Sequence, residues 1–224
     1  MKKILLATDG SEPSMQAARF LAHLPHDETI ELTIVSALFV PGTHQTYLVG
    51  DWIETCLARE RESVDQAYAE IASLFEGADV KLRHVVREGS PAETIVAIAK
   101  EEQPKLIVLG ATGHSTGAGM LLGSTSDYVA THAPCSVLVV RPTDALTHLV
   151  HFDHIGEGSV HCLEGNDVDL VVVGETPRSR LSRVLMGSMT RYVLRHAPCS
   201  VWITRNRMIR GVKKSTQKTE TATT

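Results

Sequence analysis

The sequence has no large excess of either charge. Its 22 Lys and Arg residues are set against 26 Asp and Glu residues, for a net charge of -4 at neutral pH. A protein that binds nucleic acid or an anionic membrane through its overall charge carries a strongly basic face, so we expect neither partner for this chain.

Long apolar runs are also missing. The longest, such as Leu106–Gly110 and Val168–Gly174, are far shorter than the roughly 20 residues of a membrane span. The opening Met1-Lys2-Lys3 resembles the start of a signal peptide, but the polar segment Thr8–Ser11 interrupts the apolar stretch too early. We therefore expect a cytoplasmic protein.

Cysteine is too sparse for a disulfide framework or a standard zinc site. The four cysteines, none of them in a CxxC pair, are Cys56, Cys135, Cys162 and Cys199. Cys135 and Cys199 each precede a predicted strand, which is typical of small buried hydrophobic residues. The histidines around Cys162 (His148, His151, His154 and His161) match no zinc-ligand spacing, so we predict no metal site.

The sequence does contain an internal repeat. Shifted by 64 residues, the segment Leu106–Arg141 aligns without a gap on Leu170–Arg205. The stretch from His132 to Val137 (HAPCSV) recurs unchanged from His196 to Val201. The chain therefore carries a duplicated strand–loop–helix–strand unit.

Only the first copy is preceded by the rest of a domain. The patterns predict strands at Lys3–Ala7, Thr29–Val40, Val80–Val86, Leu106–Leu109 and Ser136–Val140. They predict helices at Ser11–Leu24, Asp51–Phe75, from Ser90-Pro91 onward, and at Ser124–Thr131. Alternating strands and helices favour an open parallel sheet with helices on both faces.

The second copy is half a domain. Between Pro142 and Val168 there is room for one strand, near His148–Phe152, and a short helix or loop. We therefore divide the chain into a complete α/β domain at 1–142, a truncated second repeat at 143–205, and a polar tail at 206–224 that we expect to be disordered.

The richest candidate site is a glycine-rich loop between a strand and a helix. The strand ends at Gly110, the loop contains Gly113, and the helix begins near Gly123-Ser124. Glycines let backbone N–H groups approach phosphate oxygens, and a helix N-terminus favours anions. The loop is not a Walker A motif, because no Lys precedes the Ser. Its GxGxxxG stretch at Gly117–Gly123 follows the fourth strand rather than the first, which argues against a nicotinamide dinucleotide.

The pattern Gly110-x2-Gly113-x9-Gly123-Ser124 resembles the nucleotide motif of ATP-binding universal stress proteins, and Thr8–Ser11 resembles the opening motif of that family. The resemblance implies a five-stranded sheet in the order 3-2-1-4-5, with ATP, with or without Mg²⁺, across the carboxyl ends of strands 1 and 4. It implies contacts from Asp9 at the adenine end, the backbone near Ser36 beside the base, Gly110 and Gly113 along the ribose and phosphates, and Gly123, Ser124, Thr125 and Ser126 around the phosphates.

The second copy departs from this motif. Gly174, Gly187 and Ser188 are kept, but Pro177 replaces the glycine that corresponds to Gly113, which removes an N–H donor. No counterpart of Asp9 precedes the second copy. We therefore expect one nucleotide per chain, bound by the first copy.

The predicted function is non-catalytic nucleotide binding in a stress or signalling role. No Gly-x-Ser-x-Gly elbow and no Ser/His/Asp set is present, and the loop at 110–126 offers no base beside the phosphates, so we expect at most slow ATP hydrolysis. Two alternatives are an interaction module with a vestigial nucleotide site and a slow ATP-using enzyme on the same fold. ATP, AMP and a cyclic nucleotide remain open as the physiological ligand.

The family that the chain resembles commonly pairs its fifth strands across a dimer. We therefore predict that Ser200–Thr204 covers the edge at Ser136–Val140 within one chain. The other edge of the fragment, at Val168–Val173, would then be bare, and we predict a homodimer assembled through the fragments.

Overall fold

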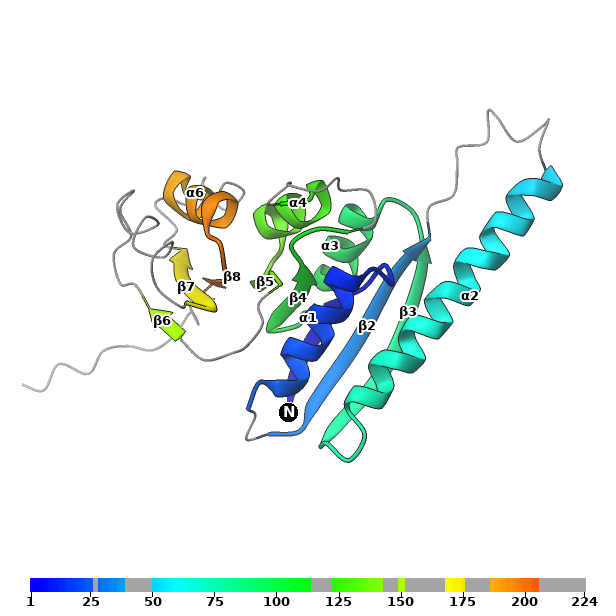
Figure 1. Ribbon diagram of the computed structural model, residues 1–224, viewed down its shortest axis with the longest axis horizontal. Coiled ribbons are helices and arrows are strands. Elements are labelled where there is room, and N and C mark those ends of the chain that lie inside the picture. The colour runs from blue at the N-terminus through cyan, green and yellow to red at the C-terminus, as the bar shows by residue number, and fades with distance from the viewer. Residues whose placement is uncertain are drawn as a thin grey trace, which may run out of the picture.

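The computed structural model describes residues 1–25, 28–38, 50–113, 122–142, 149–151, 168–175 and 186–205 (Figure 1). The elements of the first copy and the domain before it are β1 (Lys2–Ala7), α1 (Glu12–His23), β2 (Ile30–Leu38), α2 (Gly50–Leu74), β3 (Val80–Glu88), α3 (Pro91–Glu102), β4 (Leu106–Gly110), α4 (Ser124–His132) and β5 (Ser136–Val140). They are followed by β6 (Leu149–His151), β7 (Leu170–Glu175), α6 (Ser188–His196) and β8 (Ser200–Arg205).

The strands form one continuous sheet in the order β3-β2-β1-β4-β5-β8-β7-β6. The predicted α/β class and the strand order 3-2-1-4-5 are confirmed for the first five strands. The predicted count of five strands is wrong for the sheet as a whole, because the second copy adds its strands to the β5 edge and makes an eight-stranded sheet. All neighbours are parallel except β5 and β8, which run antiparallel.

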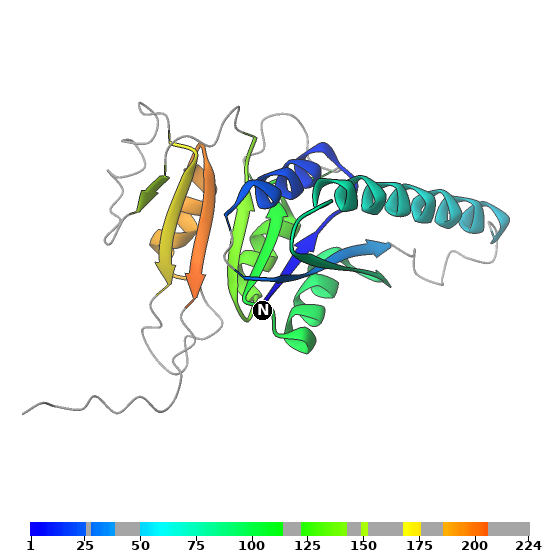
Figure 2. The same ribbon diagram turned by 90° about the horizontal axis from the view of Figure 1, so that it is seen from below.

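Helices lie on both faces of the sheet, as Figure 2 shows from below. Alternate residues of a strand point to opposite faces, so Leu5 and Ala7 of β1 join the apolar layer of α3, α4 and α6, whereas Ile4 and Leu6 join that of α1 and α2. Because both faces are covered, the central strands are apolar along their whole length, and all five residues of β4 are buried.

The repeat in the sequence is a repeat in the structure. Elements β7, α6 and β8 begin 64 residues after β4, α4 and β5. The strand predicted near His148–Phe152 is present as β6.

The two copies meet about a local two-fold axis between β5 and β8. Leu138 pairs with its own counterpart, Trp202, while Val137 pairs with Ile203 and Val139 pairs with Val201. The predicted covering of the Ser136–Val140 edge by the second copy is thus confirmed. The pairing buries Val137, Leu138 and Val139 completely (0% exposed).

Two arginines, one from each copy, reach across this axis and donate hydrogen bonds to the other copy. Arg141 donates to the carbonyl oxygens of Leu194 (2.6 Å) and Cys199 (3.3 Å) in the second copy. Its counterpart Arg205 donates to the carbonyl oxygens of Ala130 and Cys135 (3.0 Å) in the first copy. Each guanidinium therefore satisfies carbonyls at the end of the other copy's helix, where a cation also offsets the helix dipole.

The prediction that Val168–Val173 is a bare edge is wrong, because β6 pairs in parallel with β7. A short strand from the linker was enough to cover it. The homodimer stays a prediction, but a bare edge at Val168–Val173 no longer supports it. The histidines at 148, 154 and 161, Cys162 and the tail 206–224 lie outside the described residues.

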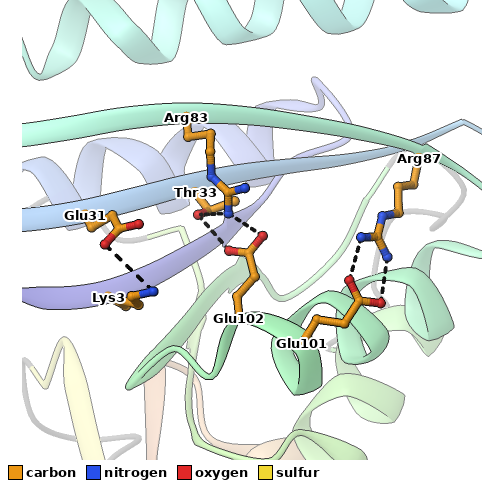
Figure 3. Close-up of polar contacts among 7 residues, drawn as sticks. All are labelled: Lys3, Glu31, Thr33, Arg83, Arg87, Glu101 and Glu102. Atoms are coloured by element: carbon orange, nitrogen blue, oxygen red, sulfur yellow. Dashed lines mark hydrogen bonds and ion pairs between the residues drawn. The ribbon is translucent and has the colours of Figure 1, made fainter.

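The opposite edge of the sheet, β3, carries charged side chains. Figure 3 shows Arg83 between Thr33 and Glu102, and Arg87 paired with Glu101 of α3. Charged groups on an edge strand disfavour pairing with another chain.

Candidate functional site

The turn after β1 places Asp9 at the carboxyl end of the sheet. Gly10 has φ +76°, a conformation that residues with a Cβ rarely adopt, and its N–H donates to the Thr8 hydroxyl oxygen at 3.1 Å. One carboxylate oxygen of Asp9, Oδ1, accepts hydrogen bonds from the backbone N–H (3.1 Å) and the hydroxyl (2.5 Å) of Ser11. Asp9 is exposed but held in place by this turn.

Gly113 lies directly against Asp9. A Cβ added at Gly113 would stand 2.5 Å from Asp9 Oδ2, closer than real Cβ atoms approach. The structure therefore brings together two of the residues that the motif assigned to one site. A side chain at 113 would have to move the Asp9 carboxylate, which Ser11 holds through Oδ1.

Gly110 is needed for a different reason. A Cβ there would stand 2.7 Å from the backbone oxygen of Pro13 in α1. Pro13 sits in the first turn of α1, where proline is tolerated, and α1 packs on β4. Gly110 therefore permits close packing of helix on strand, a role that the motif alone did not reveal.

The N-terminus of α4 faces the same edge of the sheet. The N-cap residue is Gly123, which is buried and donates its N–H to the Ala111 oxygen at 2.7 Å. No side chain among the described residues caps the helix, so the first-turn N–H groups keep their capacity for an anion. Ser124 is exposed and Thr125 is half-buried at this end.

Ser126 differs from its neighbours. It is buried (4% exposed), and its hydroxyl donates to the Gly110 oxygen at 2.8 Å. This bond joins α4 to the end of β4 and fixes the spacing of the two halves of the loop. The Ser126 hydroxyl is thus bonded to the backbone of the site.

Ser36 lies on β2, separated from β4 by β1. Its side chain is buried, and its hydroxyl lies 3.4 Å from Nε2 of His84, whose ring stacks on Tyr68 of α2. Burial lowers the pKa of His84, and the nearby Asp65 partly offsets this shift. The place of Ser36 beside a base stays a prediction.

Among the described residues, none crowds the glycines Gly174 and Gly187 of the second copy. A Cβ added at Gly174 would stand 3.8 Å from Thr204 Oγ1, and one at Gly187 would stand 3.9 Å from Thr190 Oγ1, both ordinary contacts. Pro177 and residues 114–121 of the first loop lie outside the described residues.

Neither a metal-binding cluster nor a helix able to span a membrane is present among the described residues. No group of three or more His, Cys, Asp or Glu side chains is placed to hold a metal ion within those ranges. Within the same ranges, none of the helices combines the length and apolar character needed to cross a membrane.

The fold and this edge define a class, that of α/β proteins with a doubly wound sheet and glycines at the carboxyl ends of its central strands. The model of the universal stress protein family matches residues 1–141 and again 143–205. The chain belongs to the universal stress protein family.

Individual relatives agree with this assignment. The chain is 31% identical over 140 residues to a universal stress protein of Methanocaldococcus jannaschii, covering 62% of this chain and 82% of the relative. It is 35% identical over 141 residues to one from Thermus aquaticus, covering 62% of this chain and 98% of the relative.

Two solved structures are similar in fold. The universal stress protein UspA from Lactobacillus plantarum, 27% identical, superposes with a TM-score of 0.57 over 62% of this chain and 97% of its own. A universal stress protein from Archaeoglobus fulgidus, only 16% identical, has a TM-score of 0.65 and covers 91% of this chain and 98% of its own, so that likeness extends over both copies.

Proposed function

We propose that the first copy binds one nucleotide, ATP with or without Mg²⁺, at the carboxyl ends of β1 and β4. The observation that carries the proposal is the contact between Gly113 and Asp9, where an added Cβ would stand 2.5 Å from the carboxylate. The chain has glycine at position 113, where the Asp9 carboxylate lies against the backbone.

Asp9 and the start of α4 have opposite electrostatic character, which matches the two ends of a nucleotide. Asp9 is an acceptor that repels phosphate and attracts the N–H and O–H donors of a nucleoside. The first turn of α4 offers unpaired N–H groups and the positive end of the helix dipole, which attract phosphate. This polarity supports a ligand with an uncharged hydrogen-bonding end and an anionic end.

The proposed role is binding rather than catalysis. Phosphoryl transfer requires a group that stabilises charge developing on phosphate and one that activates the nucleophile. Ser124, Thr125 and Ser126 supply hydroxyls at the start of α4, and the carboxylate of Asp127 in the same turn is paired with Arg195. We therefore propose a nucleotide-dependent stress or signalling role, with turnover below roughly one per second, the lower end of the enzyme range. The homodimer and the cytoplasmic location stay predictions.

Titration calorimetry of the full chain with ATP tests the proposal. We expect one site per chain. Gly113→Ala should weaken binding by about tenfold or more, because the new methyl group must displace the Asp9 carboxylate. Gly174→Ala, at the second-copy position that corresponds to Gly110, is a control and should bind ATP as the unaltered chain does.

Three results would count against it. A stoichiometry near two would assign a site to the second copy as well. Full affinity in Gly113→Ala would separate Asp9 from the site. Steady ATP hydrolysis that is faster than roughly one per second and is lost in Gly123→Val would mean that the cradle is catalytic.

A further inference from the structure

An ion pair links the second copy to the helix of the proposed phosphate site. Nη2 of Arg195, in the last turn of α6, lies 3.2 Å from Oδ2 of Asp127, in the first turn of α4. The antiparallel joining of the copies brings the end of α6 to the beginning of α4. Asp127 and Arg195 are 68 residues apart in the sequence, which is the 64-residue shift of the repeat plus four residues, about one helical turn. No local pattern therefore predicts the contact.

The contact between Arg195 and Asp127 does not follow the local two-fold symmetry, whereas the contacts of Arg141 and Arg205 do. Arg141 and Arg205 make the same kind of bond in both directions. The counterparts of Asp127 and Arg195 are Arg191 and Thr131, which cannot form the equivalent ion pair. The Thr131 hydroxyl instead donates to the backbone oxygen of Asp127. The ion pair therefore forms at α4 of the first copy and has no equivalent at α6.

Asp127 is an unfavourable residue beside a phosphate. A carboxylate in the first turn of a helix is attracted by the same N–H groups and dipole that would hold an anionic ligand, and it repels that ligand. Oδ1 of Asp127 is buried without a hydrogen-bond partner among the described residues, and Oδ2 is the oxygen that meets Arg195. The positive charge from the second copy offsets the carboxylate where phosphate would bind.

We infer that the second copy completes the phosphate end of the first copy's nucleotide site, with Arg195 as the positioning residue that neutralises Asp127. The inference rests on the proposed function. It gives the retained half-domain a role inside the first site instead of a second site of its own. Arg205 supports the arrangement from the other end of α4 through its bond to Ala130.

Titrations of the full chain with ATP and with adenosine at low salt test this. Arg195→Gln should weaken ATP binding about fivefold, as expected for one charge in the first turn of a helix, and should leave adenosine binding within about twofold. The loss should shrink in about 0.5 M salt, because the pair is partly exposed and therefore screened. Asp127→Asn combined with Arg195→Gln should restore ATP binding to within about twofold of the unaltered chain, since neither charge remains.

Two variants control for other causes. Arg191→Gln removes a positive charge from the same helix at the position that corresponds to Asp127, and it should not alter ATP affinity. Arg195→Lys keeps the charge and should retain most of the affinity. It also keeps the test decisive if Arg195→Gln does not fold.

The contrary outcomes are distinct. Unchanged ATP affinity in Arg195→Gln, an equal loss for adenosine, or a double variant that stays weak overturns the inference while nucleotide binding itself stands. If the unaltered chain binds neither ATP nor adenosine, the proposed function fails, and the inference fails with it.

Discussion

The two copies of the strand–helix–strand unit have the same backbone plan but different demands on their glycines. In the first copy, Gly110 and Gly113 lie against Pro13 and Asp9, which belong to the part of the domain that the second copy lacks. In the second copy, the nearest atom to a Cβ on Gly174 would be 3.8 Å away. The motif residues are constrained only where β1 and α1 are present, so the second copy keeps the shape of the unit without the surroundings of a site.

What the second copy does share with the first is its apolar core and its joining surface. Val137, Leu138 and Val139 and their partners Val201 and Ile203 are buried across β5 and β8. Selection for packing therefore explains the repeated HAPCSV segment without a second ligand.

Truncation after Pro142 should have the largest effect. It removes β8 and leaves the apolar strand β5 as an open edge, which promotes aggregation or pairing with another copy. We expect a protein that still binds ATP, more weakly than the full chain, and that aggregates or dimerises through Ser136–Val140. Light scattering and hydrogen exchange along residues 136–140 measure this. A stable monomer with unchanged exchange there would contradict it.

The two arginines that reach across the axis should differ in importance. Arg141 is buried (4% exposed) and burial lowers its pKa, whereas Arg205 is only partly buried. Arg141→Met leaves the carbonyls of Leu194 and Cys199 without this donor and should lower the free energy of unfolding by about 3 kcal/mol, in the range for hydrogen bonds to charged groups. Arg205→Met should cost about half as much, since water can replace part of what is lost. Urea denaturation of the two variants decides this. Equal losses would mean that burial does not set the difference.

The matched glycines provide a third comparison. Gly110→Ala must push α1 away from β4 and should destabilise the chain by about 2 kcal/mol, within the usual range for overpacking. Gly174→Ala meets only ordinary contacts and should change stability by less than about 0.5 kcal/mol. Melting of both variants in the same buffer measures the difference. A similar cost at the two positions would place the crowding elsewhere.

The repeat and the apolar patterns, which are local or repeat-level signals, were enough to predict the parallel α/β sheet and the three elements of the second copy. The strand order 3-2-1-4-5 and the pairing of β5 with β8 were implied by the resemblance to the universal stress protein family. The eight-stranded sheet and the covering of β7 by β6 depend on where a short linker segment returns to the sheet, which its composition does not encode. The contacts of Gly110 with Pro13 and of Arg195 with Asp127 join residues far apart in the sequence, so only the assembled fold reveals them. Asp9 and Gly113 could be found from the motif, but the reason for glycine at 113 could not.

The smallest expected effect is a pH dependence that belongs to the first domain alone, since His84 lies on β3 and stacks on Tyr68 of α2. Burial lowers the pKa of His84 below its ordinary value near 6.5, with a partial offset from Asp65. Below that value the unfolded chain binds more protons at this site than the folded chain, so the stability due to His84 falls as the pH drops through about 6.5 and levels off below the folded-state pKa. His84→Gln should therefore lose less stability than the unaltered chain between pH 7.5 and pH 5.5. Asp65→Asn should lose more at the lowest pH, because it removes the carboxylate that favours the protonated ring. Urea denaturation at both pH values measures these differences, and an identical pH dependence in all three proteins would show that His84 does not titrate differently on folding.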